Sequence, residues 1–542
     1  MASPRKSGTI NKSLTVKDAT LDLLRAFGIR KVFGNPGSTE LPFLSDWPDD
    51  IDYVLALQEA SVVGMADGYA QATRNAGFVN LHSAAGLGNA LGNIFTAHRN
   101  QTPLVIIAGQ QARSILPLQP FLYAERASEF PRPYVKFSIE PSRAEDVPAA
   151  IARAYYVAMQ PPCGPTFVSV PIDDWTHLTQ AVKTRSVSRE VFPDQGALRG
   201  LAQALEASKH PAFVVGPAID RAQAVALTVR LAEKTRAAVW ASPFSARCSF
   251  PETHPLFAGF LQASPGQLSD ALRDHDLVVV IGAPVFTFHV EGHASIFEGV
   301  TNLFQITDDG DAASATPVGT SIIASMKPAL VDLIEMMTES KRAFPKGRVL
   351  PPAPAPADPI SAEYALHALS AAMPEDAVLV EEAPSHRPAM QQFMPMRGQD
   401  SFYTMASGGL GYALPAAVGI SLGRANVRTV CLIGDGSAMY SIQALWTAAQ
   451  RKLPLMIVVL NNSGYGAMRS FSRVMQVRGV PGLDLPDIDF VKIAEGLGCE
   501  AARVAKSSNL ATTLKRALSH KGASLVEVMV DSAVPLLYER KD

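Results

Sequence analysis

The chain has 542 residues, of which 47% are hydrophobic and 18% are charged, which is enough for several buried cores. Its formal net charge of −2 argues against a nucleic-acid partner, and no apolar run reaches the 18 residues of a membrane helix. The polar N-terminus MASPRKSGTINKS lacks the apolar core of a secretion signal, so we expect a disordered tail there. Because the four cysteines have no metal-like spacing, we expect reduced thiols and a cytoplasmic protein.

The first block, residues 12–185, alternates helical and strand patterns. Such alternation predicts a parallel sheet with helices on both faces. The expected strands are 31–34, 78–83, 103–109 and 164–171, and the expected helices are 15–28, 59–73, 88–100 and 145–160.

The second block, residues 195–343, has the same style, with helical patterns at 198–208 and 222–236 and apolar runs between them. The Pro/Ala-rich stretch 344–359 is the strongest linker signal in the chain and predicts a semi-rigid extended spacer. A third block follows at 360–535. We therefore predict three α/β domains.

The third block contains a pattern that can hold a divalent metal beside a diphosphate. The run RTVCLIGD (428–435) predicts a buried strand that ends at Asp435, and Gly434 and Gly436 allow a sharp turn into a helix that Ser437 can cap. The next strand, 454–460, leads into Asn461 and Asn462. Strand ends of a parallel sheet open on one edge, so Asp435 and Asn462 can converge on Mg²⁺, or on Ca²⁺ in its place. The helix N-terminus suits a diphosphate.

Three polar residues of the first block fall at strand ends, where ligands of parallel sheets bind. Ser38 lies in the loop GNPGSTELPF, Glu59 opens a helix after strand 53–58, and His82 precedes an expected loop at 83–92. Taken singly, each has an ordinary explanation: a turn or N-cap serine, a first-turn carboxylate, and a satisfied histidine. Together they would share one crevice.

These segments resemble the benzoylformate decarboxylase family, in the pyruvate-decarboxylase-like branch of the thiamin-diphosphate (ThDP) enzymes. The resemblance covers about residues 14–535. It implies an α/β fold of three domains, each a parallel sheet flanked by helices: pyrimidine-binding, central Rossmann-like and diphosphate-binding. It also implies a homotetramer, with the Glu59 side of each active site on one chain and the Asp435 side on its partner. The motifs that carry it are GNPGSTELPFL, LQEASVVGMADGYA, LHSAAGLGNALGN, IGAPVFTFH, GGLGYALPAAVG, GDGSAMYSIQALWTAAQ and NNSGYGAM.

The resemblance assigns a role to each matched residue. Glu59 would bond the cofactor's pyrimidine, Ser38 the substrate carboxylate, and His82 and His289 would transfer protons, in an order that the resemblance leaves open. His293, near His289, has no counterpart and is expected at the surface. Leu410 would wedge the cofactor into a V shape, and the Gly464 carbonyl would complete the metal ligands Asp435 and Asn462. The diphosphate contacts would come from Gly434, Asp435, Gly436, Ser437, Ser385 and Tyr465.

The implied substrate is an aromatic or bulky 2-keto acid, such as benzoylformate, that loses CO₂ to give an aldehyde. Carboligation is an expected side reaction. The implied pocket is mostly apolar and consists of Phe121, Leu122, Thr404, Met468 and Phe471. Thr404 departs from the aromatic residue usual in the family, which predicts room for substituted or longer acids.

Three other functions compete with this interpretation. A carboligase of the acetolactate-synthase kind shares the fold but would lack the pair His82 and His289. A CoA-linked lyase or decarboxylase would need a basic cluster for an ADP group, which is not evident in the sequence. A non-catalytic binding module would be expected to lose Glu59 or the metal pair, and both are present.

Overall fold

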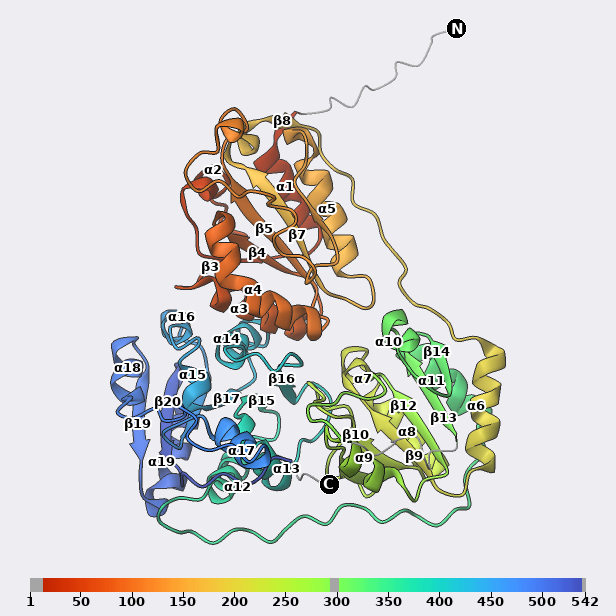
Figure 1. Cartoon of the computed structure of the whole chain (residues 1–542). Coiled ribbons are helices and arrows are strands. Elements are labelled where there is room, and N and C mark those ends of the chain that lie inside the picture. Colours follow the sequence, from red (N-terminus) through yellow and green to blue (C-terminus); the bar gives the residue numbers. More distant parts are fainter. Residues whose placement is uncertain (1–12, 293–301, 539–542) are drawn as a thin grey trace. The chain divides into compact units, whose positions relative to one another are not determined.

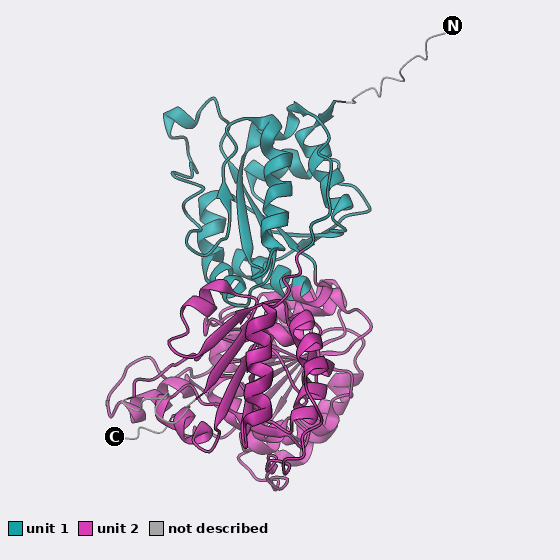
Figure 2. Cartoon of the chain, turned by 90° about the vertical axis from the view of Figure 1, so that its right-hand side faces the viewer, with its two compact units in different colours: residues 1–70, 75–188 teal, residues 71–74, 189–542 magenta. Residues whose placement is uncertain are grey.

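The computed structural model describes residues 13–292 and 302–538; the expected N-terminal tail before residue 13 and His293 lie outside the described residues. The chain forms two compact units, residues 1–70 with 75–188 and residues 71–74 with 189–542 (Figure 2). Three six-stranded parallel sheets flanked by helices confirm the predicted fold class (Figure 1). Among the described helices, none combines the length and the hydropathy needed to cross a membrane.

The sheet of unit 1 has the order β3-β2-β4-β5-β7-β6, with every neighbouring pair parallel. A separate antiparallel pair joins β1 (Leu14–Thr15) to β8 (Leu178–Thr179). The strands of the main sheet are β2 (Lys31–Gly34), β3 (Asp52–Leu55), β4 (Gly77–Leu81), β5 (Leu104–Gln110), β6 (Ser138–Ile139) and β7 (Pro165–Pro171).

Helices α4 and α5 both pack against β5, and α1 packs against α5. The expected loop at 83–92 is wrong, because α4 begins directly at Ser83. Small residues in SAAGLGNALG hid the helical pattern, although they allow the helix to pack closely. The helices that begin in unit 1 are α1 (Val16–Ala26), α2 (Leu41–Leu44), α3 (Glu59–Thr73), α4 (Ser83–Arg99) and α5 (Val147–Ala158).

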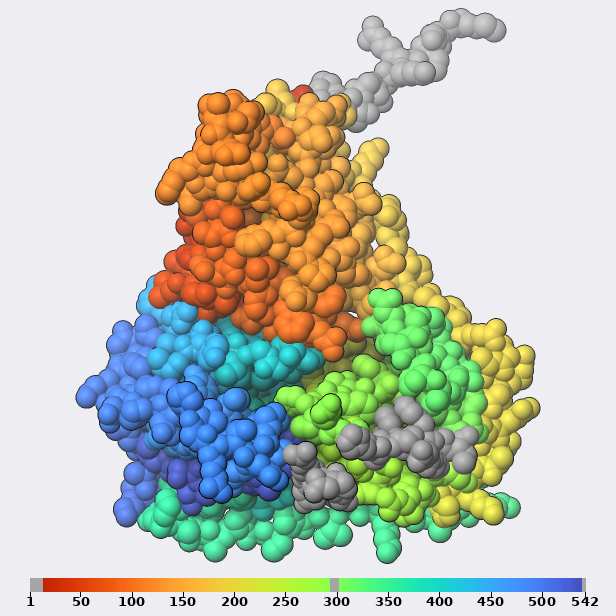
Figure 3. Space-filling model, viewed as in Figure 1, coloured from red at the N-terminus to blue at the C-terminus, as the bar shows by residue number. Residues whose placement is uncertain are grey.

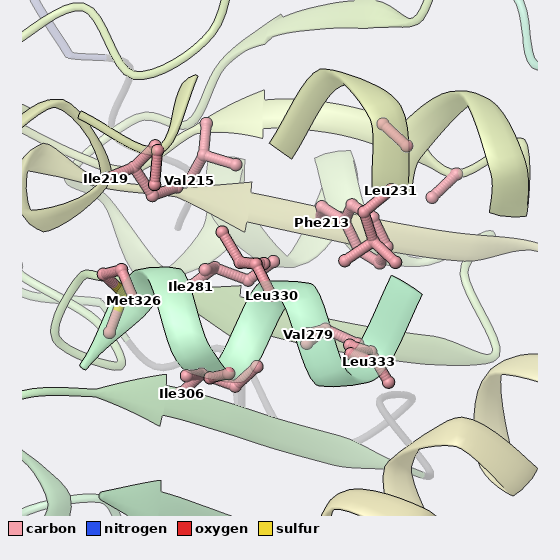
Figure 4. Close-up of a cluster of buried hydrophobic side chains, with 14 of the residues drawn as sticks. Phe213, Val215, Ile219, Leu231, Val279, Ile281, Ile306, Met326, Leu330 and Leu333 are labelled. Atoms are coloured by element: carbon pink, nitrogen blue, oxygen red, sulfur yellow. The ribbon is translucent and has the colours of Figure 1, made fainter. Parts of the chain in front are cut away.

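The first sheet of unit 2 has the order β11-β10-β9-β12-β13-β14. Its core packs β9, β12 and β13 against helices α8 and α11 through side chains such as Phe213, Val279 and Leu330 (Figure 4). The strands are β9 (Pro211–Val215), β10 (Ala238–Ala241), β11 (Phe257–Phe260), β12 (Leu277–Ile281), β13 (Leu303–Thr307) and β14 (Thr320–Ile323). The helices are α6 (Gln195–Ala207), α7 (Pro217–Arg221), α8 (Val225–Thr235), α9 (Pro265–Leu272), α10 (Gly310–Ser314) and α11 (Met326–Met336).

The second sheet of unit 2 has the order β16-β15-β17-β18-β20-β19. Its strands are β15 (Val378–Glu382), β16 (Phe402–Thr404), β17 (Thr429–Gly434), β18 (Leu455–Asn461), β19 (Glu500–Val504) and β20 (Ser524–Met529). Its helices are α12 (Ala362–Ala372), α13 (Arg387–Phe393), α14 (Ala413–Gly423), α15 (Asp435–Ala438), α16 (Ala444–Gln450), α17 (Gly466–Val474), α18 (Phe490–Gly496) and α19 (Ser507–Ser519).

The helix after β17 is broken, which corrects one expectation. Ser437 does not cap a long helix, because it lies inside the single turn α15, and α16 begins only at Ala444. Between the two sheets of unit 2, residues 344–359 have no helix or strand and follow the surface (Figure 3). Their side chains are mostly exposed, with Val349 90% exposed.

A buried charge network lies inside unit 2. Arg247 is 4% exposed and donates from Nε to Asp220 at 2.5 Å, from Nη1 to Gln71 at 2.7 Å and from Nη2 to Asp400 at 2.9 Å. Its guanidinium also lies 3.9 Å from the centre of the Tyr403 ring. Asp220 in turn accepts a hydrogen bond from the Asp400 amide at 2.7 Å. A buried arginine is tolerated because its donors are matched by carboxylate and amide oxygens.

A buried histidine makes the stability of this unit depend on pH. His386 is 3% exposed, and burial lowers its pKa from 6.5 to about 4. The unfolded chain therefore binds more protons between these two values, so unfolding becomes easier as the pH falls from 6.5 to 4. Replacing His386 with glutamine should remove about 1–3 kcal/mol of this pH dependence. Thermal midpoints measured from pH 4 to 7.5 check it.

The exposed His177 supplies the matched control. His177→Gln should keep the pH dependence of the parent, because the His177 side chain is exposed to solvent and not buried as His386 is. If His386→Gln and the parent lost stability in parallel between pH 6.5 and 4, His386 would not be the group responsible.

Candidate active site

The end of β17 carries the first half of the predicted metal site. β17 and β18 are parallel neighbours with Gly434 opposite Leu460, so the residues that follow both strands meet at one edge. Asp435 Oδ2 accepts a hydrogen bond from the Gly464 amide at 2.9 Å, and Oδ1 accepts from the Gly436 amide at 2.8 Å. Burial raises the pKa of Asp435. The structure thus brings Asp435 and Gly464 together.

The two asparagines at the end of β18, Asn461 and Asn462, have different environments. Asn461 donates to Glu527 at 2.7 Å and accepts from the Ser463 amide at 2.9 Å, so its side chain is used in the fold. Asn462 is 4% exposed, and its Oδ1 is buried without a hydrogen-bond partner. A buried oxygen without a donor fits a cation, since leaving such an atom unmatched is costly.

The chemistry of this donor set fits a hard ion rather than a transition metal. The described residues hold no group of three or more His, Cys, Asp and Glu side chains placed to bind a metal. The site instead combines one carboxylate, one amide oxygen and a backbone carbonyl, and the phosphate oxygens of a ligand would complete an oxygen shell.

Glycines allow a ligand or a ring to approach the chain here. A Cβ at Gly436 would lie 2.6 Å from the Tyr465 ring, so only glycine fits there. A Cβ at Gly466, the first residue of α17, would lie 2.7 Å from Asn462 Nδ2 and 2.8 Å from Ser385 Oγ. The predicted cofactor residues Ser385 and Tyr465 are therefore both placed beside the metal motif.

Leu410 precedes α14 in a turn that Glu382 holds. The buried Glu382 carboxylate, at the end of β15, accepts hydrogen bonds from the amides of Gly411 at 2.7 Å, Tyr412 at 2.8 Å and Ala413 at 2.7 Å. Gly411 has φ +97°, a conformation that favours glycine. Glu382 was not predicted, although two adjacent glutamates at the end of an apolar strand were a usable signal.

In unit 1, the Glu59 carboxylate is held by two asparagine side chains. Asn35 Nδ2 donates to Oε1 at 3.2 Å and Asn89 Nδ2 donates to Oε2 at 3.1 Å. A Cβ at Gly86, in the first turns of α4, would lie 3.3 Å from Glu59, so the backbone of α4 lies against the carboxylate. Asn35 and Asn89 were not predicted, because an asparagine in a loop or a helix carries no signal of its own.

His82 is also held by a carboxylate that the sequence analysis missed. Its Nδ1 lies 2.9 Å from Glu40 Oε2 and 3.1 Å from Thr39 Oγ1. Glu40 is 2% exposed and also accepts from the amides of Gly37 at 2.8 Å and Gly109 at 3.1 Å. Because an ionised carboxylate only accepts, Nδ1 carries the proton and Nε2 is left as the basic nitrogen.

Ser38 begins the short 3₁₀ helix η1 (Ser38–Glu40) and is exposed. Two residues of the loop after β2 thus form hydrogen bonds with the predicted site: Asn35 with Glu59 and Glu40 with His82. Ser38 lies between Asn35 and Glu40 in the sequence of this loop. All three predicted residues of this unit lie at the carboxyl edge of the same sheet, where the strands β2, β3 and β4 end. The signal for Glu40 was its position two residues after Ser38 in the same loop.

His289 follows β12 in unit 2 and is surrounded by rings. Its ring centre lies 4.9 Å from Phe471, 5.6 Å from Tyr538 and 5.7 Å from Phe244. Nδ1 lies 3.2 Å from the Tyr538 hydroxyl. Burial lowers the pKa of His289, so the imidazole is neutral at pH 7. Tyr538 was not predicted, since it follows the last apolar strand.

The predicted pocket residues fall into different environments. Phe121 and Leu122 belong to unit 1, where Phe121 is 87% exposed. Met468 and Phe471 lie on α17, with Met468 49% exposed. Thr404 is 1% exposed; its hydroxyl donates to the Glu381 carbonyl at 2.8 Å and accepts from Arg387 at 2.6 Å. The Thr404 hydroxyl is therefore already occupied within unit 2 and is not free to bond a substrate hydroxyl.

Comparison with known families defines the class of protein. The N-terminal thiamine pyrophosphate (TPP) binding domain of the thiamine pyrophosphate enzymes matches residues 14–127, their central domain matches 198–333 and their C-terminal TPP binding domain matches 383–528. The chain belongs to the thiamine pyrophosphate enzymes, that is, the ThDP enzymes.

Individual relatives show which family of the thiamine pyrophosphate enzymes the chain resembles. A benzoylformate decarboxylase of Pseudomonas aeruginosa is 41% identical over 526 residues, 96% of this chain and 100% of that protein. A benzoylformate decarboxylase structure from Polynucleobacter necessarius matches with TM-score 0.94 and 42% identity over 96% and 99% of the two chains. A 4-hydroxybenzoylformate decarboxylase structure from Rhodococcus jostii matches with TM-score 0.92 and 41% identity over the same shares. Within its class, the chain belongs to the benzoylformate decarboxylase family.

Proposed function

We propose that the chain catalyses the ThDP- and Mg²⁺-dependent, non-oxidative decarboxylation of an aromatic 2-keto acid to an aldehyde and CO₂. The observation that carries the proposal is the ordered imidazole of His82, held at Nδ1 by the buried Glu40 at the sheet edge where Glu59 lies. A carboligase of the acetolactate-synthase kind would have no need of this histidine. The likeness to benzoylformate decarboxylases over 96% of the chain supports the same activity.

The proposed division of labour follows from each residue's environment. Bound ThDP supplies a nucleophilic carbon and accepts the electrons released when CO₂ leaves. Glu59 would hold a proton at the cofactor's pyrimidine nitrogen; the two asparagine donors hold its carboxylate in place. Ser38, an uncharged donor, would bind the substrate carboxylate. His82 would accept or return a proton at Nε2.

Asp435, Asn462 and the Gly464 carbonyl would hold the metal, and Ser385, Ser437 and the backbone of Gly434 and Gly436 would contact the diphosphate. Tyr465, packed against Gly436, and Leu410, held in its turn through Glu382, would support the cofactor. Apolar side chains would surround the substrate ring, with Phe121 and Leu122 on one chain and Met468 and Phe471 on its partner. This division requires an assembly, and we propose a homotetramer in the cytoplasm.

Loss of the buried amide oxygen should weaken metal binding. Asn462→Ala should raise the Mg²⁺ concentration needed for half-maximal ThDP binding by at least about tenfold, because one oxygen ligand is removed. Calorimetric titration of ThDP at a series of Mg²⁺ concentrations measures it. Asn509→Ala, an exposed substitution on α19, is the control and should bind as the parent does. Equal Mg²⁺ dependence of both variants would remove Asn462 from the metal site.

The activity is tested by CO₂ release and aldehyde formation from benzoylformate, 4-hydroxybenzoylformate and pyruvate, with ThDP and Mg²⁺ present. We expect turnover of both aromatic acids and little of pyruvate, because the pocket residues other than Thr404 are apolar. No turnover of any of the three, in a protein that binds ThDP, would favour a CoA-linked or carboligating relative. Added benzaldehyde should yield a benzoin-type product as a side reaction, since bound ThDP would also support carbon–carbon bond formation with an aldehyde.

A further inference from the structure

The segment after β20 is fixed to α17. The Leu537 amide donates to Ser470 Oγ at 2.8 Å, and Arg473 donates to the Val534 carbonyl. Val534 is buried beside Gly466, where a Cβ would lie 2.7 Å from its Cγ2. Segment 531–538, which we call the C-terminal strap, is thus anchored along the helix that carries Met468 and Phe471.

The strap ends with Tyr538 against His289. Tyr538 is 8% exposed, its ring stands at 87° to the imidazole, and its hydroxyl lies 3.2 Å from Nδ1. The two other rings around His289, Phe244 and Phe471, carry no polar atom. Among these three rings, the phenol alone can form a hydrogen bond with the imidazole.

The direction of this hydrogen bond follows from the two groups. Burial raises the pKa of Tyr538 to about 12, despite the opposing charge of Arg387, so the phenol keeps its proton. His289 is neutral at pH 7, because burial lowers its pKa and the nearby Glu291 is exposed to water. A phenol O–H is a stronger donor than acceptor, and a neutral imidazole offers one nitrogen lone pair.

We propose that Tyr538 is a positioning residue for the reaction: its hydroxyl donates to Nδ1 of His289 and fixes the tautomer that carries its proton on Nε2. This inference rests on the proposed function. His289 then presents an N–H donor, whereas Glu40 leaves His82 with a basic Nε2. The two histidines are set to opposite roles before any substrate binds: the Nε2–H of His289 donates a hydrogen bond, and Nε2 of His82 can accept a proton.

The first test needs neither substrate nor cofactor. Hydrogen–deuterium exchange at the imidazole C2 position, followed by mass spectrometry, gives the pKa of His289 in the parent and in Tyr538→Phe. A donor to Nδ1 stabilises the neutral ring, so its removal should raise the pKa of His289 by about 0.5 to 1 unit. An unchanged or lower pKa of His289 in Tyr538→Phe would overturn the proposal, whichever substrate the enzyme uses.

The second test compares variants of the full chain. With benzoylformate, Tyr538→Phe should lower kcat about tenfold with little change in KM, and Ser470→Ala, which frees one anchor of the strap, should lie between it and the parent. Tyr364→Phe on α12 is the matched control and should behave as the parent. Parent-like kcat in Tyr538→Phe would overturn the role of Tyr538, whereas inactivity of the parent itself would count against the proposed function alone.

Discussion

Replacing Glu59 with glutamine should lower kcat for benzoylformate by about two to four orders of magnitude, the range found when a positioned proton-transfer group is removed. Glutamine keeps the size of the side chain and one oxygen for Asn35 or Asn89, so the fold should persist. It has no carboxylate to hold a proton at the cofactor. Steady-state CO₂ release, together with calorimetric ThDP affinity, separates lost chemistry from lost binding.

The exposed Glu145, also in unit 1, provides the matched substitution. Glu145→Gln should turn over benzoylformate at the rate of the parent. If Glu59→Gln kept more than about a tenth of the parental kcat, the carboxylate would not take part in proton transfer, and its two asparagine bonds would be structural.

Replacing Arg247 with methionine should destabilise unit 2 by about 3–5 kcal/mol, because it leaves two buried aspartates without their cation. Asp220 is fully buried and Asp400 is mostly so, and neither can easily regain water. The loss should appear as a lower urea midpoint. Since a chain with several domains can unfold in steps, fluorescence and circular dichroism should both be followed.

An exposed arginine with the same kind of partner tests whether burial is the cause. Arg397 pairs with Glu375 at 2.7 Å, but both side chains are more than half exposed. Arg397→Met should change the unfolding free energy by no more than about 1 kcal/mol. If both variants lost the same unfolding free energy, the burial of Arg247 would not make its ion pairs more stabilising than the exposed pair of Arg397.

Much of the fold could be predicted because it rests on local patterns. β17 and β18 are runs of β-branched and apolar residues buried on both faces, and their parallel pairing follows from the helices between them. Two boundaries were wrong where composition and structure diverge. Helix α4 begins at Ser83, earlier than the sequence pattern indicated, because its first turns consist of small residues. The helix after Asp435 is interrupted, so Ser437 lies inside a single turn and does not cap a longer helix.

The candidate site was harder to predict from the sequence than the fold, because its polar residues form hydrogen bonds with residues far away along the chain. The motif residues Asp435, Asn462, Glu59 and His82 stand at strand ends, and topology alone could place them. The residues that support them lie too far along the chain for local periodicity to pair them. Glu40 reaches His82 over 42 positions and Tyr538 reaches His289 over 249, distances at which periodicity carries no information. Thr404, expected beside the substrate, has its hydroxyl bonded to the Glu381 carbonyl and to Arg387, which the sequence pattern did not indicate.

The anchoring of the C-terminal strap, residues 531–538, on α17 bears on how the protein's substrate range should be engineered. Ser470 and Arg473 hold Leu537 and Val534 from the same nine-residue helix that carries Met468 and Phe471. Substitutions in residues 531–538 should therefore act on the helix that carries two of the proposed pocket residues. Directed evolution of substrate range at 468 or 471 should randomise the terminal segment in the same library.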